Sequence, residues 1–427
     1  MRTISLVACA AALLSTASAI NLVERRDAAP KVVQHEVQRR EVGNPLLRDR
    51  MRRRQLKTIS ENLDNEETLY FANVSLGTPA QNLRLHIDTG SSDLWVNVAG
   101  SPLCRSSGNP CGASGTYAPN SSTTYAYIDS IFNISYVDGS GSSGDYVSDV
   151  LRIGGATLQG QQFGVGYQST SQEGLIGIGY PVNEALVSKL NGRTYPNVPQ
   201  HMMQAGLINT NAYSLWLNDL DASTGSILFG GINTGKFHGT LQTLPIIKEQ
   251  GYYAEFVIAL TAVGTNGKKG SIASGLTTPA LLDSGSSLMY LPDNICTAIF
   301  KQLGATWDNK QGAAFIDCNM ANSATTLDFT FSSATISVEM NELVIVAGTE
   351  RGKPVCILGI GPAGSSTPVL GDTFLRSAYV VYDLSANQIS LAQTNFNSTS
   401  DNILEIANGT NGVPGATGVA SPVTSAA

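Results

Sequence analysis

Apolar and polar residues alternate in short stretches along most of the chain, in the pattern of β-strands. In residues 83–87 (LRLHI) every second position is apolar, which predicts a strand with one buried face. Further short strands are predicted in TLYFANVSL, YVSDVLRIGG, AYSLWLNDL, GSILFGG, TLDFTF and SAYVVYDL. Helical patterns stand out only near residues 183–192 and 293–304. The pattern predicts a mostly β protein with a few short helices.

Two copies of one motif stand in this pattern. LRLHIDTGSSDLWV contains Asp88 and PALLDSGSSLMYLP contains Asp283, each followed by Thr or Ser, Gly, Ser and Ser between apolar strands. A second match follows at nearly equal spacing, with Gly177 in GLIGIGY and Gly371 in TPVLGDTF. Repeat arrays have periods of about 20 to 50 residues, far shorter than this one. The sequence therefore indicates a duplicated lobe.

The length of 427 residues suits two lobes with appendages. We expect an N-terminal lobe at residues 55–235 and a C-terminal lobe at 236–395, with the boundary near the turn-rich GGINTGKFHG. Residues 396–427, rich in Asn, Gly, Thr and Ser, are expected to form a flexible low-complexity tail. Only 14% of residues are charged and 43 are glycines, which favours a β-rich core with many turns.

The first 19 residues have the features of a signal peptide. A basic start precedes the apolar run Ile4–Leu14, and Ala17-Ser18-Ala19 has the small-x-small form of a cleavage site. This run is too short to span a bilayer, and no later stretch reaches the ~18 apolar residues that a membrane helix needs. We therefore expect a secreted, extracellular protein that is not held in a membrane.

The next segment, residues 20–54, is basic. Residues 20–57 hold eleven Lys or Arg and five acidic residues, whereas residues 58–427 hold 14 basic and 28 acidic residues. Such a segment could be a solvated or nucleic-acid-binding arm, but an exported protein meets no nucleic acid. We interpret it as a removable pro-segment that is cut after Arg52-Arg53-Arg54 and that binds and inhibits the acidic body until then.

Five cysteines follow the predicted signal peptide, as in an exported protein. With one free thiol they allow fifteen disulfide arrangements, and the sequence leaves the choice open. Cys104 and Cys111 flank a short polar loop where a local bridge is natural. Cys318 and Cys356 would close a longer loop. Cys296 falls on the apolar face of the helix predicted at 293–304 and is expected to be a buried free thiol.

The duplicated acids have a chemical use if the lobes pack about a pseudo-two-fold axis. Asp88 and Asp283 would then face each other across a cleft and share one proton, because two adjacent carboxylates cannot both ionise cheaply. The neutral carboxyl can donate to a substrate carbonyl while its partner takes a proton from an attacking water, without a covalent intermediate. The motif therefore predicts a hydrolase.

The residues beside each acid fit this chemistry. Gly90 and Gly285 would let the backbone approach the acids and the substrate closely. Ser91 and Ser286 could hydrogen-bond the outer carboxylate oxygens and keep the acids coplanar.

The chain from Thr68 to Leu391 resembles pepsin-type aspartic endopeptidases. The resemblance lies in HIDTGSSDLWV, LLDSGSSLMYLP, ISYVDGSGSSGDY, GLIGIGY and VLGDTFLRSAYVVYDL. The loop between the first cysteine pair, YVDGS and LPDNICTAIFKQLGA most resemble the fungal secreted yapsin and candidapepsin groups. The resemblance implies a bilobal, all-β dominated fold, cleavage of peptide bonds in proteins at acidic pH, synthesis as a zymogen, and Asp88 and Asp283 as the dyad.

The resemblance also implies roles for other residues. Tyr136 corresponds to a tyrosine on a hairpin, the flap, that closes over the substrate, and Trp95 to its indole partner. The family disulfide of the second lobe corresponds to the pair Cys318–Cys356. Asp138 would approach substrate side chains and attract Lys or Arg, as in yapsins; alternatively it only caps the hairpin turn.

Other functions have weaker support. No Ser has Gly at both −2 and +2, which argues against a serine hydrolase. The four histidines are scattered and form no His-Glu-x-x-His motif, so neither metal nor cofactor is expected. The main alternative is a catalytically inactive pepsin-like binding or inhibitor protein, which should have lost an acid, a motif glycine or the flap tyrosine.

Two further expectations concern the surface of the protein. We expect a monomer. Five sequons permit N-glycosylation, at Asn73, Asn120, Asn133, Asn397 and Asn408.

Overall fold

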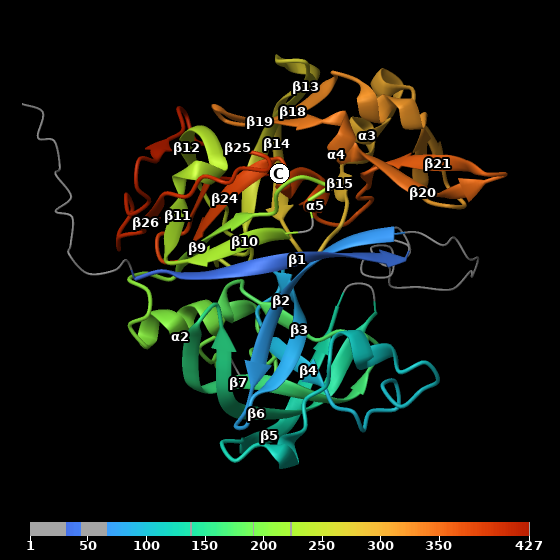
Figure 1. The fold of residues 1–427 in the computed structure, drawn as a ribbon. Helices are drawn as coiled ribbons and strands as arrows, with labels where there is room; N and C mark the ends of the chain where they lie inside the picture. Colours follow the sequence, from blue (N-terminus) through green and yellow to red (C-terminus); the bar gives the residue numbers. More distant parts are fainter. Residues whose placement is uncertain (1–30, 44–65, 137–138, 191, 223, 427) are drawn as a thin grey trace, which may run out of the picture. The chain divides into compact units, whose positions relative to one another are not determined.

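β-strands are the main secondary structure of the computed structural model, which confirms the predicted mostly β fold (Figure 1). The structure describes residues 31–43, 66–136, 139–190, 192–222 and 224–426. The predicted signal peptide and the Arg52–Arg54 triplet lie outside these residues.

One long sheet contains strands from both halves of the chain. Its strands follow the order β27 (Thr417–Gly418), β12 (Phe237–Pro245), β25 (Gln388–Thr394), β24 (Ala378–Asp383), β9 (Ala212–Trp216), β10 (Thr224–Phe229), β1 (Val33–Gly43), β2 (Glu66–Leu76), β3 (Gln81–Asp88), β8 (Leu175–Gly177), β4 (Leu94–Asn97), β7 (Ala156–Ser169), β6 (Gly141–Ile153) and β5 (Ala126–Ser135). Strand β1, from the expected pro-segment, lies between β10 and β2 (Figure 1).

The second half of the chain also forms three separate sheets, two larger ones and one small one. The seven-stranded sheet has the order β19 (Ala334–Glu339), β18 (Thr326–Phe331), β13 (Val257–Thr265), β14 (Lys268–Leu282), β23 (Val369–Leu370), β15 (Met289–Leu291) and β22 (Ile360–Pro362). The four-stranded sheet has the order β16 (Thr306–Asp308), β17 (Ala313–Ile316), β21 (Lys353–Leu358) and β20 (Val344–Glu350). Strands β11 (Gly231–Asn233) and β26 (Ile403–Glu405) form the small sheet.

The helices of the described residues are few and short. They are α2 (Val198–Gln204), α3 (Asp293–Leu303), α4 (Met340–Leu343) and α5 (Asp372–Leu375), with 3-10 turns at Pro110–Ala113, Pro119–Ser121, Pro181–Asn183, Thr234–Lys236 and Cys318–Asn322. Helix α3 confirms the helix predicted at 293–304. It buries one apolar face and ends at Gly304, whose φ of 71° suits glycine. None of these helices is long and apolar enough to cross a membrane.

The helix predicted near residues 183–192 is wrong, because residues 184–190 form a series of turns. The backbone N–H of Ala185 donates to the Asp93 carboxylate at 2.7 Å, and the Glu184 carboxylate accepts the N–H of Tyr195 at 2.9 Å. The backbone N–H groups of Val187 and Lys189 donate to carbonyl oxygens three residues back, at 3.0 Å each, as in single turns. The helix begins later, at α2, where Asn197 caps the N-terminus.

The two motif copies have the same local arrangement. Strand β3 runs parallel to β8 with Asp88 opposite Gly177, and β14 runs parallel to β23 with Leu282 opposite Leu370. A Cβ on Gly177 would lie 2.5 Å from the Ser92 nitrogen, and one on Gly371 would lie 2.2 Å from a backbone oxygen. Both glycines are therefore required by the close approach of the turn that follows each acid.

The C-terminal segment is not the flexible tail that its composition predicted. Strand β26 pairs with β11, and β27 pairs with β12. Ile406, Val413 and Val419 are buried. The segment is ordered because these apolar side chains, spaced among small polar residues, pack on the core.

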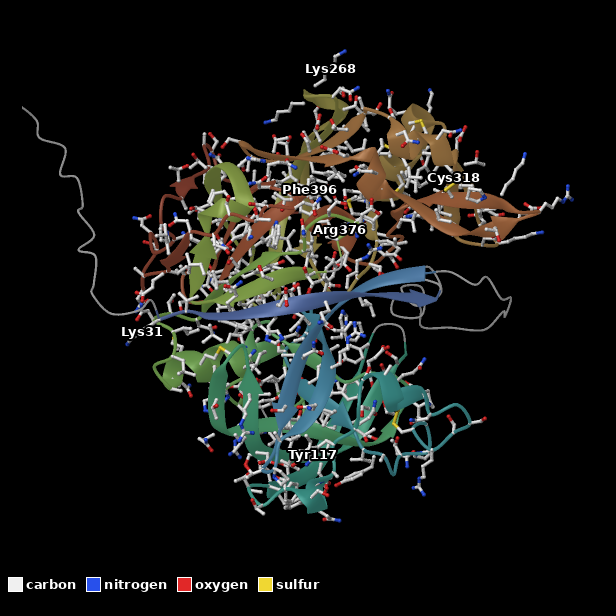
Figure 2. The ribbon with its side chains drawn as sticks, viewed as in Figure 1. Lys31, Tyr117, Lys268, Cys318, Arg376 and Phe396 are labelled. Atoms are coloured by element: carbon white, nitrogen blue, oxygen red, sulfur yellow. A yellow bond between two sulfur atoms is a disulfide. The ribbon has the colours of Figure 1, made fainter. Side chains whose placement is uncertain are left out.

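The cysteine arrangement follows the pattern expected from the loops. Cys104–Cys111 and Cys318–Cys356 are disulfides, and Cys318 is marked in Figure 2. Cys296 is a buried free thiol on α3, and burial raises its pKa to about 12, which makes it a poor nucleophile.

A buried ion pair in the expected C-terminal lobe also contacts the backbone of the expected N-terminal lobe. Arg376, inside the molecule in Figure 2, donates to the Glu342 carboxylate and, at 2.7 Å, to its carbonyl oxygen. The same carboxylate accepts the backbone N–H of Leu220 at 3.1 Å. Both charged side chains are fully buried, so losing either one would leave an uncompensated charge.

Candidate active site

The first motif holds its acid with two short hydrogen bonds. Asp88 ends β3, and the turn that follows brings the Gly90 N–H to 2.8 Å from its Oδ1. The Ser91 hydroxyl donates to its Oδ2 at 2.6 Å. Asp88 is buried, so these donors replace the water that the carboxylate has lost. One edge of the carboxyl group is therefore fixed by the turn.

The second motif repeats this geometry. The Gly285 N–H donates to Oδ1 of Asp283 at 2.8 Å, and the Ser286 hydroxyl donates to Oδ2 at 2.7 Å. Each carboxyl group thus has one oxygen bound by a glycine amide and one by a serine hydroxyl, as the duplicated sequence suggests.

The fold brings the two acids together. A Cβ added to Gly90 would lie 2.5 Å from Oδ1 and 2.8 Å from Cγ of Asp283. The turn that holds Asp88 therefore abuts the other acid, and only a glycine leaves room for this approach. Both acids line one cavity of about 270 Å³. Paired carboxyl groups in a partly enclosed cavity can act as a general acid and a general base.

The residue after each acid braces the other motif, a role that sequence analysis missed. The Thr89 hydroxyl donates to the Leu282 carbonyl at 2.9 Å and accepts the Ser284 N–H at 2.9 Å. In the reciprocal contact, the Ser284 hydroxyl donates to the Ile87 carbonyl at 3.1 Å and accepts the Thr89 N–H at 3.2 Å. The available signal was a hydroxyl residue directly after each Asp. We call these four hydrogen bonds the crossed brace.

Tyr136 lies at the end of a hairpin beside this cavity. It follows β5, and its N–H donates to the Ser140 carbonyl at 2.8 Å. The Trp95 indole N–H donates to the Tyr136 hydroxyl at 2.7 Å, and Tyr136 lines the cavity. Asp138, the expected specificity residue, lies outside the described residues.

The second acid of the first motif, Asp93, does not line the cavity. Asp93 is fully buried and accepts the hydroxyls of Tyr146 and Tyr195, each at 3.0 Å, as well as the Ala185 N–H. Burial raises the pKa of Asp93 even though these hydrogen bonds oppose it. Asp93 supports the packed cluster behind the hairpin, which contains Trp95.

Sequence analysis also missed Glu255, which precedes β13 and lines the cavity with both acids. Its pKa is raised to about 7, first by burial and then by the negative charges of Glu249, Asp283 and Asp88. No motif marks this glutamate, because it lies in an ordinary apolar context (YYAEFVI). Ser366 and Thr367 complete the polar lining.

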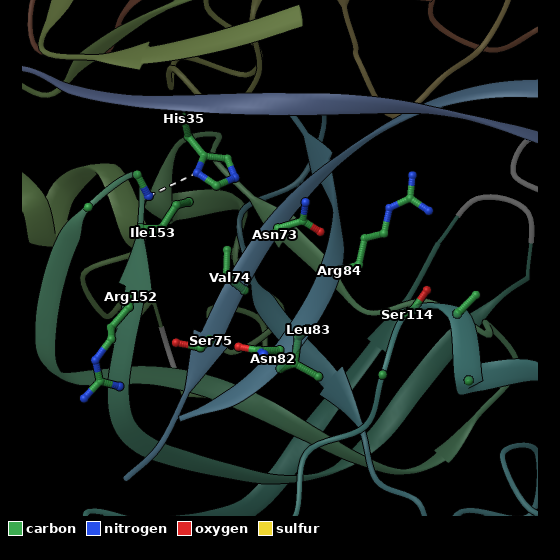
Figure 3. A pocket seen from close by; sticks show the side chains of 15 residues that line it. His35, Asn73, Val74, Ser75, Asn82, Leu83, Arg84, Ser114, Arg152 and Ile153 are labelled. Carbon is green, nitrogen blue, oxygen red and sulfur yellow. Dashed lines mark hydrogen bonds between the residues drawn. The ribbon is translucent and has the colours of Figure 1, made fainter. Parts of the chain in front are cut away.

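A larger hollow, of about 730 Å³, lies elsewhere and contains neither acid (Figure 3). Its lining includes His35, Asn73, Arg84 and Arg152 but no carboxylate. His35 is already engaged, since its Nδ1 accepts the Gly154 N–H at 3.0 Å. This hollow offers no acid–base pair for catalysis. Among the described residues, no cluster of His, Cys, Asp and Glu side chains is arranged to hold a metal ion.

The sequon asparagines and Asp372 differ in their exposure to solvent. All five sequon asparagines are exposed, so N-glycosylation stays a prediction with accessible sites. Asp372, in VLGDTF, is buried and does not line the cavity.

Comparison with known proteins agrees with this geometry. The family model described as eukaryotic aspartyl protease matches residues 69–394. The chain is 56% identical to the probable aspartic-type endopeptidase opsB of Aspergillus oryzae, over 98% of this chain and 87% of that protein. It is 37% identical to secreted aspartic protease 8 of Candida albicans, over 80% of each chain.

A solved structure shows the same fold. The crystal structure of the aspartic proteinase from Irpex lacteus matches with a TM-score of 0.66 at 22% identity, covering 86% of this chain and all of that one. Together with the family match and the relatives, these findings establish that the chain belongs to the eukaryotic aspartyl protease family and is an aspartic endopeptidase.

Proposed function

We propose that this protein is a secreted enzyme, made as a zymogen, that hydrolyses peptide bonds in proteins at acidic pH with Asp88 and Asp283 as its catalytic dyad. The observation that carries the proposal is the equivalent setting of the two acids. Each has the same glycine and serine donors, and both line one cavity.

The dyad works with one proton between its two carboxyl groups, since adjacent carboxylates repel each other strongly. The neutral carboxyl group donates to the scissile carbonyl oxygen. The ionised one takes a proton from a water molecule, whose oxygen then attacks the carbonyl carbon. Proton return to the leaving nitrogen breaks the C–N bond and restores the dyad. The serine and glycine donors keep the carboxyl groups oriented, and the crossed brace keeps the two motifs together.

Tyr136 covers the reacting groups. Its hairpin closes over a peptide bound in the cavity and excludes water, while the hydrogen bond from Trp95 limits the positions of the tyrosine ring. Asp138 is retained as a candidate contact to substrate side chains.

Support for secretion and for a zymogen comes from the sequence and from one relative. The signal-like residues 1–19 and the basic residues 20–54 precede the acidic body. A relative carries the printed name secreted aspartic protease. We propose that the monomeric enzyme is released after its pro-segment has been cut near Arg54.

The dyad is tested by replacing each acid with its amide. Asp88→Asn or Asp283→Asn should lower kcat on a denatured protein at acidic pH by about a thousandfold or more, because each acid has a separate proton-transfer role. The thermal unfolding midpoint should change little, since the amide nearly preserves the shape of the side chain.

Glu339→Gln, which removes a carboxylate at the exposed end of β19, is the matched control and should keep full activity. A tenth of the parent rate in either dyad variant would contradict the mechanism. A parent protein that binds a statine inhibitor but cuts no substrate would identify an inactive binding protein instead.

A further inference from the structure

The cavity of the dyad contains a third carboxyl group. Glu255 lines it together with Asp88 and Asp283, and the other described residues of the lining include no Lys, Arg or His. Glu255 is partly exposed, and among the described residues no side chain or backbone group donates a hydrogen bond to its carboxyl group. The cavity is therefore acidic, with one acid that has no donor of its own.

The surroundings of Glu255 oppose its ionisation. Burial is the largest cause of its raised pKa, followed by the charges of Glu249, Asp283 and Asp88. The base next to Glu249 in the sequence, Lys248, is placed over the ring of Tyr253, 5.0 Å from its centroid. Asp88 and Asp283 have glycine and serine donors, whereas no partner among the described residues favours the charged form of Glu255.

A cationic side chain from a substrate would supply that missing partner. A carboxylate and an ammonium group in a partly desolvated cavity attract each other more strongly than an exposed pair does. A neutral carboxyl group, by contrast, can border an uncharged side chain without leaving a charge unpaired.

On this basis, and given the dyad proposed above, we propose that Glu255 is a specificity-determining residue that makes the side-chain preference of the cavity depend on pH. In its neutral form it admits uncharged substrate side chains. In its ionised form it selects Lys or Arg beside the scissile bond.

The direction of the pH effect follows from linkage. Without substrate, Glu255 is neutral at acidic pH, because its pKa is raised to about 7. A bound cation stabilises the ionised form and lowers this pKa within the complex. The preference for a cationic side chain should therefore be weak near pH 3.5 and should grow as the pH rises toward 6.5.

The experiment compares two peptides that differ only at one position beside the cut, Lys in one and norleucine in the other. The ratio of their kcat/KM values is measured from pH 3.5 to 6.5. In the parent enzyme the ratio of Lys to norleucine peptide should rise by about fivefold or more. In Glu255→Gln it should stay flat, because an amide does not ionise.

Two further variants sharpen the comparison. Glu249→Gln removes one of the charges that raise the pKa of Glu255, so the rise should move to lower pH. Glu339→Gln removes a carboxylate from the exposed end of β19, and the rise should stay as in the parent.

The outcomes separate this inference from the proposed function. An equal rise in the parent and in Glu255→Gln, or no rise in the parent, overturns the inference while cleavage by the dyad stands. Binding of the same peptides to Asp88→Asn gives a readout without turnover. In the double variant Asp88→Asn, Glu255→Gln, the pH-dependent preference for binding the Lys peptide should be lost. If that preference persists, the inference is overturned.

Discussion

Single atoms decide whether the two acids of this enzyme can meet. The backbone of Gly90 passes so close to Asp283 that one methyl group would collide with the carboxyl oxygen. The hydroxyls of Thr89 and Ser284 tie each motif to the backbone of the other. The geometry of the dyad thus rests on small side chains beside the acids.

The crossed brace can be tested at Thr89. Thr89→Val keeps the shape of the side chain but removes one donor and one acceptor, leaving the Leu282 carbonyl and the Ser284 N–H unpaired in the interior. Its free energy of unfolding should fall by about 1–3 kcal/mol per unsatisfied group, and kcat should fall as the acids lose their alignment. Denaturant unfolding and peptide hydrolysis measure both.

Thr89→Ser is the matched control, because serine already occupies the equivalent position at Ser284. It retains the hydroxyl and should keep most of the stability and activity. Equal losses in the two variants would show that the hydrogen bonds of the brace are unimportant.

A buried glutamate predicts how stability depends on pH. Burial raises the pKa of Glu184 to about 9 from its ordinary 4.5; the Asp93 charge adds to this and the hydrogen bond from the Tyr195 N–H opposes it. The folded protein therefore holds a proton at Glu184 that the unfolded chain releases above pH 4.5. Its contribution to stability is complete below that pH and is lost as the pH rises toward 9.

The thermal unfolding midpoint should accordingly decline from pH 5 to 8, and Glu184→Gln should make this decline shallower. The exposed Glu339→Gln control should leave the slope unchanged. A slope in Glu184→Gln as steep as in the parent would assign the pH dependence to other groups, among them Glu255.

Among the elements, the two C-terminal strands have the clearest structural role. They pair with β11 and with the edge of β12, and the segment that carries them buries Ile406, Val413 and Val419. A chain ending after Asn395 should lose about 4 kcal/mol or more of its free energy of unfolding, since burying each such side chain contributes about 1.5–3 kcal/mol. Denaturant unfolding would measure the loss.

A chain ending after Thr424 keeps all three buried side chains, both strands and the contact of Val423 with the core, so it should unfold much like the full chain. If the chain ending after Asn395 is as stable as the full chain, the two strands contribute nothing to the stability of the fold.

At the scale of the whole molecule, the expected pro-segment is part of the main sheet. Strand β1 pairs with β10 on one side and β2 on the other, so cutting the chain near Arg54 does not by itself release it. Its departure would expose two strand edges, which need new partners. We therefore expect the cut segment to stay bound near neutral pH.

Acidification should release it, because the acidic body loses negative charge and attracts the basic segment less. Changing Arg52, Arg53 and Arg54 together to Ala should slow maturation after a shift to acidic pH, or move the cut. Mass spectrometry of the chain over time measures both. Unchanged rate and position would place the natural cut elsewhere.

Local features of the sequence determined much of this protein. The strand periodicity, helix α3 and the two acid motifs could be predicted because strands, helices and turns depend on neighbouring residues. The same local logic failed near residues 183–192, where the distant Asp93 accepts the N–H of Ala185 and the following backbone N–H groups close single turns. It also failed in the C-terminal segment, whose scattered apolar residues find their partners only in the folded core.

Tertiary structure alone decided how these parts combine. Asp88 and Asp283 are far apart in the chain, and their approach depends on the crossed brace and on Gly90. Glu255 joins them through the packing of strands that no motif marks. The pKa of Glu255 depends on burial and on the charges of Glu249 and the dyad. Both are set by the groups that surround the carboxyl group in space, which the local sequence does not reveal.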